Sequence, residues 1–160
     1  MSAEITIREG TLGDLSRAQA VRAETFELHR RRAVPQHFRA TDSPPPTRTF
    51  VGDLLESGNG TFLLAEAGGE VIGFATVRVG DAPDEPYWMP ARVAFVDSLG
   101  VLEARRGKGA GRALMAAEAW ARNHGAERLH LNVWEFNEGA IAFYEALCYT
   151  TFSRNMWRQL

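Results

Sequence analysis

The sequence contains one cysteine, Cys148, and four histidines that include no pair at the spacing of metal ligands. A lone cysteine excludes an intramolecular disulfide and a cysteine-rich metal site. The histidines are His29, His37, His124 and His130. We therefore expect no metal cofactor. We interpret Cys148 as a small, partly buried thiol and not as a nucleophile, because no histidine lies in an evident supporting position.

Long apolar runs and an excess of one charge are also missing. No stretch approaches the roughly 18 apolar residues that a membrane-spanning helix needs, and the first residues read as a charged strand, not as the apolar core of a signal peptide. The formal net charge is −2 at pH 7, which gives no electrostatic reason to expect a nucleic-acid or membrane partner. The sequence therefore predicts a cytoplasmic protein with neither partner.

The 160 residues are 45% apolar and 24% charged, which is typical of a single soluble domain with one core, here residues 1–160. Alternation of apolar and polar residues predicts strands at residues 4–8, 61–67, 70–79, 92–101, 128–134 and 151–160. Helical spacing predicts helices at residues 11–28, 47–57, 111–124 and 137–147. No repeat or linker divides the chain.

The order of these elements predicts a mixed α/β domain. The glycine pair at 68 and 69 predicts a hairpin turn between two strands. Residues 30–47 are expected to be irregular, and residues 80–90 are expected to form an exposed loop. The strand, turn, helix and strand over residues 92–134 form a βαβ crossover, so its two strands are expected to be parallel.

The most informative stretch is the glycine-rich turn at residues 105–112, which reads RRGKGAGR. Alternate glycines let the backbone approach a ligand closely and adopt positive φ without strain. The helix that follows supplies unpaired N–H groups and the positive end of its dipole, which suit a pyrophosphate. Three basic side chains add positive charge around the turn. These residues are Gly107, Gly109 and Gly111, and Arg106, Lys108 and Arg112.

Other phosphate-binding motifs do not fit this turn. A Walker loop would place glycine at 102 and serine or threonine at 109, where the chain has Leu102 and Gly109. A dinucleotide-binding fingerprint that starts at Gly109 would need a small residue where Leu114 stands. A turn with a purely structural role is the remaining alternative.

Residues 101–112 resemble the signature V-x-x-x-x-Q/R-x-x-G-x-G/A of the GCN5-related N-acetyltransferases (GNAT). The fixed positions are matched by Val101, Arg106, Gly109 and Gly111. The resemblance implies an α/β fold with a central mixed, largely antiparallel sheet, a parallel strand pair at the coenzyme cleft and flanking helices. It also implies acetyl-CoA as the co-substrate. The implied contacts are Leu99, Gly100 and Val101 with the pantetheine arm, and Arg106, Gly107, Lys108, Gly109, Ala110, Gly111 and Arg112 with the pyrophosphate.

Residues 137–149 resemble the family's second signature, N-x-x-A-x-x-F-Y-E-x-x-G-F/Y. It is matched by Asn137, Ala140, Phe143, Tyr144, Glu145 and Tyr149. By this resemblance, Asn137 hydrogen bonds to the pantetheine arm, and Tyr144 lies near the thioester sulfur and protonates the departing thiolate. The alternatives are a helix N-cap for Asn137 and a merely packed ring for Tyr144. Cys148 stands where the family has glycine, which predicts a slightly different turn after the helix.

The resemblance implies direct attack of a primary amine on the thioester through a tetrahedral intermediate, with backbone N–H groups of residues 99–101 stabilising the oxyanion. The amine must first lose a proton, since an unperturbed lysine-like amine has a pKa of about 10.4. Asp97 is the candidate base, because alternation places it on the same face of its strand as Leu99. A simple ion pair with an arginine is an equal alternative. Glu135 and Glu103 are weaker candidates.

The acceptor is expected to enter between the first two helices and the loop at residues 80–90. A small amine or a polyamine-like metabolite is favoured. The alternatives are a lysine or N-terminal amine of a protein, and a non-catalytic sensor that only binds acyl-CoA. The candidates for an acidic entrance, or for ordinary solvated surface, are Glu24, Glu27, Asp81, Asp84 and Glu85. Trp88 and Tyr87 are candidates for lining the acceptor pocket or for covering a dimer contact. A homodimer is common in the family and is compatible with this sequence.

Overall fold

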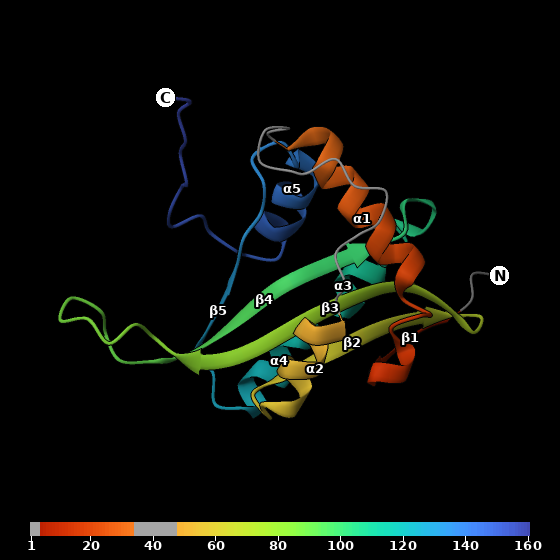
Figure 1. Ribbon diagram of the computed structural model, residues 1–160, viewed down its shortest axis with the longest axis horizontal. Helices are drawn as coiled ribbons and strands as arrows, with labels where there is room; N and C mark the ends of the chain where they lie inside the picture. The colour runs from red at the N-terminus through yellow and green to blue at the C-terminus, as the bar shows by residue number, and fades with distance from the viewer. Residues whose placement is uncertain (1–3, 34–47) are drawn as a thin grey trace.

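The computed structural model describes residues 4–33 and 48–160, and its centre is one five-stranded sheet (Figure 1). The strands are β1 (Ile5–Glu9), β2 (Gly60–Ala67), β3 (Glu70–Asp81), β4 (Arg92–Val101) and β5 (Arg128–Leu131). They lie in sequence order, and each neighbouring pair is antiparallel except β4 and β5, which are parallel. The predicted fold class, a mixed and largely antiparallel sheet with one parallel pair, is confirmed.

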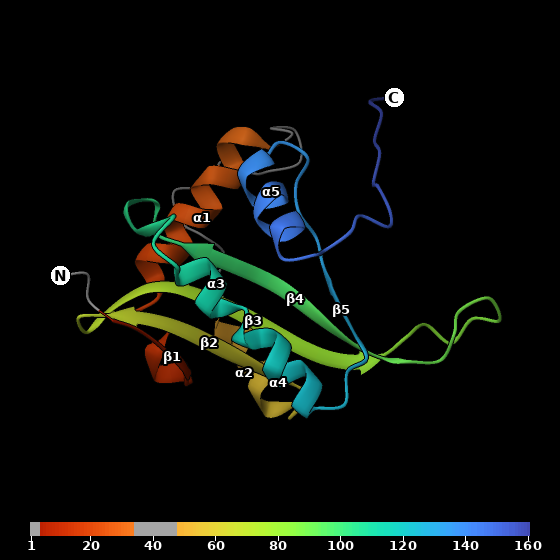
Figure 2. The same cartoon turned by 180° about the vertical axis from the view of Figure 1, so that it is seen from behind.

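Helices cover both faces of the sheet. They are α1 (Gln19–Arg32), α2 (Arg48–Glu56), α3 (Ala110–Leu114), α4 (Ala116–Asn123) and α5 (Glu138–Ala146). The face seen in Figure 1 carries α1 and α2, and the face seen in Figure 2 carries α3 and α4. In both views α5 lies beside one end of α1.

Alternation along the strands divides the core into two layers. In β2, Leu63 and Ala65 face the layer under α3 and α4, whereas Phe62 and Leu64 face α1 and α2. All four side chains are almost completely buried. Because both faces of the strand are buried, a slip of one residue would exchange the two layers, so the packing fixes the register of the sheet.

The first helix begins later than its predicted N-cap. Thr11 and Asp14 form the capping box that the sequence indicates, but this box starts only the 3-10 turn Leu12–Asp14, and α1 follows at Gln19. The Asp14 carboxylate accepts hydrogen bonds from the Arg8 guanidinium at 2.6 Å and from the Thr11 amide at 2.9 Å. These contacts hold the pKa of Asp14 well below its usual range, so the carboxylate stays charged and pins the N-terminal strand to the turn.

Two further elements are shorter than predicted. The helix expected over residues 111–124 is interrupted at Met115, whose amide bonds to the Arg112 carbonyl three residues back instead of four. The strand expected over residues 128–134 ends at Leu131, where its pairing with β4 ends. The spacing of apolar side chains in the sequence cannot predict where the backbone hydrogen bonding of a helix or strand is interrupted.

The strand predicted over residues 151–160 does not form. All ten residues are exposed and none belongs to a helix or strand. An extended segment becomes a strand only when a neighbour accepts and donates its backbone hydrogen bonds. Within the described part of the chain no element pairs with this segment. The prediction is therefore wrong, because alternation of side chains alone does not supply the hydrogen-bonding partner that a strand needs.

Most of the segment predicted to be irregular, together with the start of the second predicted helix, lies outside the described residues. In the part of the chain that the structure does describe, none of the helices combines the length and the apolar character needed to cross a membrane.

Candidate functional site

The central feature of the site is a fork between β4 and β5. The two strands pair only from Val93 with Arg128 to Val96 with Leu131. Beyond this point β4 continues to Val101, paired with β3 on its other side only, while the chain after β5 runs toward α5 (Figure 1). Among the residues that the structure describes, no strand takes the outward-pointing backbone groups of β4 at residues 99–101, so this edge is available to a ligand.

A β-bulge sits at the point where the fork opens. Thr76 of β3 is opposite Ser98, but the next residue, Val77, is opposite Val96, which leaves Asp97 as the extra residue. Val96 and Leu99 consequently both pack on the core under α3 and α4. The expectation that Asp97 shares a face with Leu99 is therefore wrong, because the extra residue reverses the alternation.

Asp97 lies instead on the face that carries α1 and α2. Its carboxylate accepts a hydrogen bond of 2.9 Å from Nε of Arg78, and the Arg78 guanidinium carbon lies 4.5 Å from the centroid of the Phe95 ring. The Asp97 side chain keeps 25% of its surface exposed. The structure thus contains the ion pair that was the alternative interpretation. A role for Asp97 as a base stays a prediction.

The weaker base candidates lie in different surroundings. Glu135 follows β5, is mostly exposed and pairs with Arg154 at 3.6 Å. Glu103 begins a 3-10 turn after β4, and its backbone amide donates to the Glu24 carboxylate. Neither side chain shares the bulge with Asp97.

The glycine-rich turn follows β4 and leads directly into α3. Gly107 has φ of 72° and Gly109, the residue before α3, has φ of 95°. Both values lie in the left-handed region that favours glycine, which explains the residue type at each position. The amides of residues 107–109 donate no backbone hydrogen bond to any described residue. A Cβ at Gly107 would meet no atom within 4 Å. The turn therefore presents unpaired donors on an unobstructed surface.

The three basic residues of the turn have different surroundings. Nε of Arg106 donates to the Val101 carbonyl at 3.1 Å, and its guanidinium lies 3.6 Å from Glu24. Arg106 therefore ties the turn back to β4. Lys108 caps the Ala104 carbonyl at 3.1 Å. Arg112 is exposed and forms no hydrogen bond or ion pair with residues 4–33 or 48–160, so its charge faces solvent.

The two signature segments meet at Gly111. A Cβ added to Gly111 would lie 3.3 Å from Cζ of Phe143 in α5. The absence of that Cβ lets the α5 ring pack against the first turn of α3. The fold thus brings the glycine-rich turn, which follows β4, into contact with α5.

Asn137 is the N-cap of α5. Its Oδ1 accepts a hydrogen bond of 3.2 Å from the Ala140 amide, so the capping role is present whether or not the side-chain NH₂ also binds a ligand. The cap fixes Asn137 at the start of the helix that carries Tyr144.

Tyr144 is packed between two aromatic rings of α5 and the turn after it. The ring centroids of Phe143 and Tyr149 lie 5.2 and 5.6 Å away. Burial raises the pKa of the Tyr144 hydroxyl above its ordinary value, so Tyr144 is neutral and able to donate a proton at neutral pH. Tyr149 is held differently, since its hydroxyl donates to the Glu118 carboxylate of α4 at 2.8 Å.

Cys148 occupies a position with glycine geometry. Its φ is 66°, and it is the one non-glycine residue with positive φ in the described chain. The Tyr149 amide bonds to the Tyr144 carbonyl and the Cys148 amide to the Glu145 carbonyl, which is the Schellman pattern of a helix end. The slightly different turn expected here is not seen. The usual left-handed turn is retained with a side chain in it, and the thiol is exposed and not partly buried.

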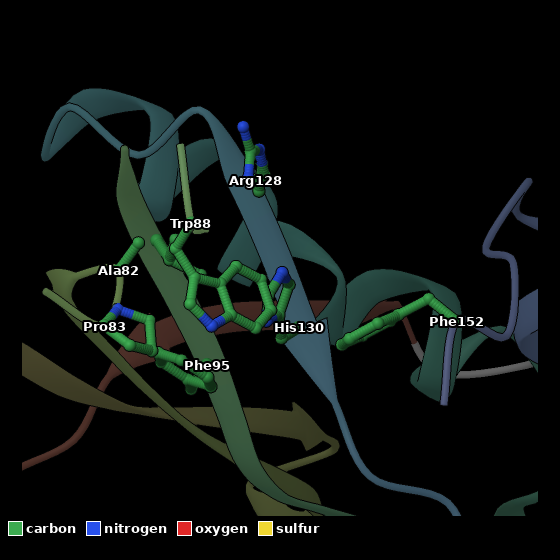
Figure 3. Close-up of a pocket in the computed structure, with 8 residues that line it drawn as sticks. Ala82, Pro83, Trp88, Phe95, Arg128, His130 and Phe152 are labelled. Carbon is green, nitrogen blue, oxygen red and sulfur yellow. The ribbon is translucent and has the colours of Figure 1, made fainter. Parts of the chain in front are cut away.

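A cavity of about 220 Å³ lies beside the paired part of β4 and β5 (Figure 3). Its lining consists of Ala82, Pro83, Trp88, Val93, Phe95, Arg128, His130 and Phe152. The ring centroids of His130 and Phe95 are 5.3 Å apart, and those of His130 and Phe152 are 5.0 Å apart. Burial, with a smaller contribution from Arg128, lowers the pKa of His130, so its ring is neutral at neutral pH. The walls are apolar and aromatic.

Sequence reasoning singled out one of the aromatic residues of this cavity. Trp88 lines the cavity, whereas its neighbour Tyr87 is 79% exposed and does not. A role for either residue in an acceptor pocket stays a prediction. The sequence analysis did not identify Phe95 and His130, because an aromatic residue in a strand is normally interpreted as part of the hydrophobic core. The signal that could have found Phe95 is its position two residues before Asp97.

A buried hydroxyl next to the bulge was also missed. Oγ1 of Thr76 is inaccessible to solvent and finds no hydrogen-bond partner in the described part of the chain. Thr76 faces Ser98 across the β3–β4 ladder. Threonine in a strand is common, so nothing in the sequence sets this residue apart.

The acidic residues proposed for the entrance are mostly engaged with arginines. Glu24 lies near Arg106, Asp81 near Arg92, and Glu27 binds Arg30 and Arg31. The hydrogen bond from Arg30, reinforced by Arg31, lowers the pKa of Glu27 to about 2. Among residues 4–33 and 48–160, no group of three histidine, cysteine or acidic side chains is arranged to hold a metal ion.

The chain is similar in sequence to known acetyltransferases. The model of the acetyltransferase (GNAT) family matches residues 23–148. The chain is similar to the uncharacterized N-acetyltransferase YdgE of Bacillus subtilis, with 42% identity over 44% of this chain and 46% of that protein. It is also similar to an aminoglycoside N(6')-acetyltransferase of Stenotrophomonas maltophilia, with 34% identity over 55% of this chain and 58% of that protein. The matched regions thus span about half the length of these relatives.

Solved structures share the fold over nearly the whole chain. A mutant of the BH1408 protein from Bacillus halodurans superposes with a TM-score of 0.87 at 24% identity, over 97% of this chain and 99% of that one. The aminoglycoside N-acetyltransferase AAC(6')-Iy, solved in complex with CoA, superposes with a TM-score of 0.74 at 20% identity, over 100% of this chain and 97% of that one. At these identities the likeness concerns the fold.

Proposed function

Because the chain belongs to the acetyltransferase (GNAT) family, we propose that it transfers the acetyl group of acetyl-CoA to a primary amine. One observation carries the proposal. The contact between Gly111 and Phe143 brings the glycine-rich turn and the Tyr144 helix together at the open end of the β4–β5 fork. A turn with a purely structural role would need neither unpaired amides nor an open strand edge beside it.

The residues at the fork suit acetyl-CoA in charge and hydrogen-bonding capacity. The unpaired amides of residues 107–109 and the exposed Arg112 suit a pyrophosphate. The edge of β4 at residues 99–101, which no described strand pairs with, offers backbone groups to the amides of a pantetheine arm. The resemblance assigns these same residues to acetyl-CoA, and the open geometry supports the assignment.

The proposed reaction forms a C–N bond and breaks the C–S bond of the thioester. Backbone N–H groups of β4 at the fork stabilise the oxyanion of the tetrahedral intermediate. Tyr144, kept neutral by burial, donates its hydroxyl proton to the departing thiolate. The proton lost by the amine passes to Asp97, either directly or through water. Arg78 holds this carboxylate at the bulge.

The acceptor is proposed to bind on the face of the sheet opposite α3 and α4. The glycine-rich turn that receives the coenzyme leads into α3, so an amine can reach the thioester from the other face. Asp97 and the aromatic cavity both lie on that face. The cavity's aromatic walls favour an amine with an apolar body over a polyamine. Three of the five candidate carboxylates at the entrance, Glu24, Glu27 and Asp81, are already paired with arginines.

The test is the release of CoA from acetyl-CoA with a panel of amines, including phenethylamine, spermidine and a lysine peptide. We expect kcat/KM to be highest for phenethylamine. Phe95→Ala should raise KM for this amine while acetyl-CoA affinity stays unchanged, and Tyr87→Ala, in the neighbouring exposed loop, serves as the control. A preference for spermidine would contradict the apolar acceptor. Binding of acetyl-CoA without turnover of any amine would support a sensor instead.

A further inference from the structure

The glycine-rich turn depends on contacts outside its own backbone for its order. Gly107 and Gly109 give the turn its left-handed geometry, but glycine loses more conformational freedom on ordering than any other residue. The amides of residues 107–109 donate no backbone hydrogen bond to a described residue. Ordering such a turn weakens the binding of a ligand unless other contacts order the turn beforehand.

Such contacts come from Glu24 of α1, far away in the sequence. Oε1 of Glu24 accepts a hydrogen bond from the Glu103 backbone amide and lies 3.6 Å from Nη2 of Arg106. Nε of Arg106 donates to the Val101 carbonyl at 3.1 Å. The Arg106 side chain therefore lies between α1 and the end of β4, directly before the first unpaired amide of the turn.

The part of α1 that carries Glu24 is packed firmly on β4. In Figures 1 and 2, α1 passes over the end of this strand. The hydroxyl of the next residue, Thr25, donates to the Val21 carbonyl at 2.8 Å, and Val21 is completely buried. A Cβ added to Gly100 of β4 would overlap the Thr25 hydroxyl, so helix and strand are in close contact. Glu24 thus projects from a fixed part of the helix.

The charge of Glu24 by itself predicts the opposite effect on an anionic ligand. A carboxylate near the turn repels a pyrophosphate, so its removal would strengthen binding by repulsion alone. The side chains of Glu24 and Arg106 keep 38% and 42% of their surface exposed, so water and salt screen this repulsion. The sign of the change in affinity therefore separates ordering of the turn from simple repulsion.

We propose that Glu24 is a positioning residue that orders the glycine-rich turn for acetyl-CoA through Arg106. This inference rests on the proposed function, since it assumes that the coenzyme binds at the turn. Glu24 is then not part of an acidic entrance for the amine. Because α1 lies on the face proposed for the acceptor, the same helix borders the acceptor site and orders the coenzyme site.

The experiment measures the dissociation constant of acetyl-CoA by calorimetry. Glu24→Gln removes the charge but keeps an oxygen that can accept from the Glu103 amide, so the constant should rise about two- to fivefold, as for an exposed ion pair. Glu24→Ala also removes the acceptor, so the rise should reach about tenfold. Glu70→Gln is the matched control, because the Glu70 carboxylate accepts a 2.8 Å hydrogen bond from Arg105, the residue before Arg106. The control should leave the constant unchanged or lower it slightly.

A double-mutant cycle tests whether Glu24 acts through Arg106. The variant that combines Glu24→Gln with Arg106→Ala should bind acetyl-CoA no more weakly than Arg106→Ala alone. With an amine that the protein acetylates, Glu24→Gln should raise KM for acetyl-CoA and leave kcat at saturation unchanged. Circular dichroism shows that each variant is folded, and Glu24→Gln keeps the size of the side chain.

The results that would overturn the inference differ from those that would overturn the proposed function. If the unaltered protein binds acetyl-CoA but Glu24→Gln binds it equally or more tightly, Glu24 does not order the turn. Equal losses in Glu24→Gln and Glu70→Gln, or losses that multiply in the double variant, would also contradict the role through Arg106. If the unaltered protein binds no acetyl-CoA, the proposed function fails and this inference fails with it.

Discussion

The two sides of the β4–β5 fork are built from different kinds of residue. On the side proposed for the coenzyme, Gly107 and Gly109 hold positive φ and Gly111 makes room for Phe143. Few residue types can replace these glycines, so this side leaves a recognisable sequence pattern. On the side proposed for the acceptor, Phe95, Trp88 and His130 form apolar walls that many other residues could form. A site can therefore be predicted from the sequence where backbone geometry constrains the residue type. It cannot be predicted where only the shape and polarity of the side chains matter.

The largest effect is expected for a substitution at Gly109, on the side of the fork that is proposed for the coenzyme. Gly109→Asp puts a side chain at φ of 95° and a negative charge beside the pyrophosphate, so acetyl-CoA binding measured by calorimetry should be abolished. Gly58→Asp is the control, because Gly58 also has positive φ and open space but follows α2. If the two variants bind acetyl-CoA equally well, the turn has only a structural role.

A smaller loss is expected for a substitution at Tyr144. Tyr144→Phe should lower kcat by roughly ten- to a thousand-fold with acetyl-CoA affinity nearly unchanged. Burial raises the pKa of the Tyr144 hydroxyl. The protonated form that the reaction needs therefore persists to a higher pH than it would for an ordinary tyrosine. Tyr149→Phe, which removes the hydroxyl bonded to Glu118, should reduce stability more than kcat. Equal kcat for Tyr144→Phe and the unaltered protein would assign the proton to water.

Two variants of the Asp97–Arg78 ion pair test the side of the fork that is proposed for the acceptor. If Asp97 is the base, Asp97→Asn should lose activity at neutral pH and recover part of it at high pH, where more of the amine is already deprotonated. Arg78→Leu should retain most of the activity, since the Asp97 carboxyl group is still present. The pH profile of kcat/KM for both variants is the measurement. Matching losses of activity and thermal stability in the two variants, with no recovery at high pH, would leave Asp97 as a structural partner of Arg78.

The smallest effect concerns stability alone. Cys148→Gly should raise the free energy of unfolding by about 0.5 to 1 kcal/mol, because glycine relieves the left-handed strain at φ of 66° at some cost in chain entropy. Urea unfolding measures the change, and kcat should not move. Cys148→Ala keeps the Cβ and should give no gain. A gain with alanine would implicate the thiol and not the backbone.

The sequence predicted the sheet and most helices because burial on both faces enforces regular patterns, as in β2 and β3. Its two motifs also assigned residues 99–101, the glycine-rich turn and Tyr144 to one site. The roles of these residues stay predictions. It failed at Asp97, since a β-bulge adds one residue to β4 without any signature and reverses the face on which the later residues of the strand lie. It failed at residues 151–160 because periodicity says nothing about where a strand's hydrogen-bonding partner lies.

The contact between Gly111 and Phe143 has a consequence for how such proteins vary and can be recombined. Any Cβ at 111 would press on the Phe143 ring, which must then shift by a few tenths of an ångström. Alanine at 111 should therefore co-occur with a smaller or displaced side chain at 143 in related sequences. A chimera that took its glycine-rich turn from one protein and its α5 from another would inherit a mismatch at this contact. The two segments form one transplantable unit, although a whole helix and strand separate them along the chain.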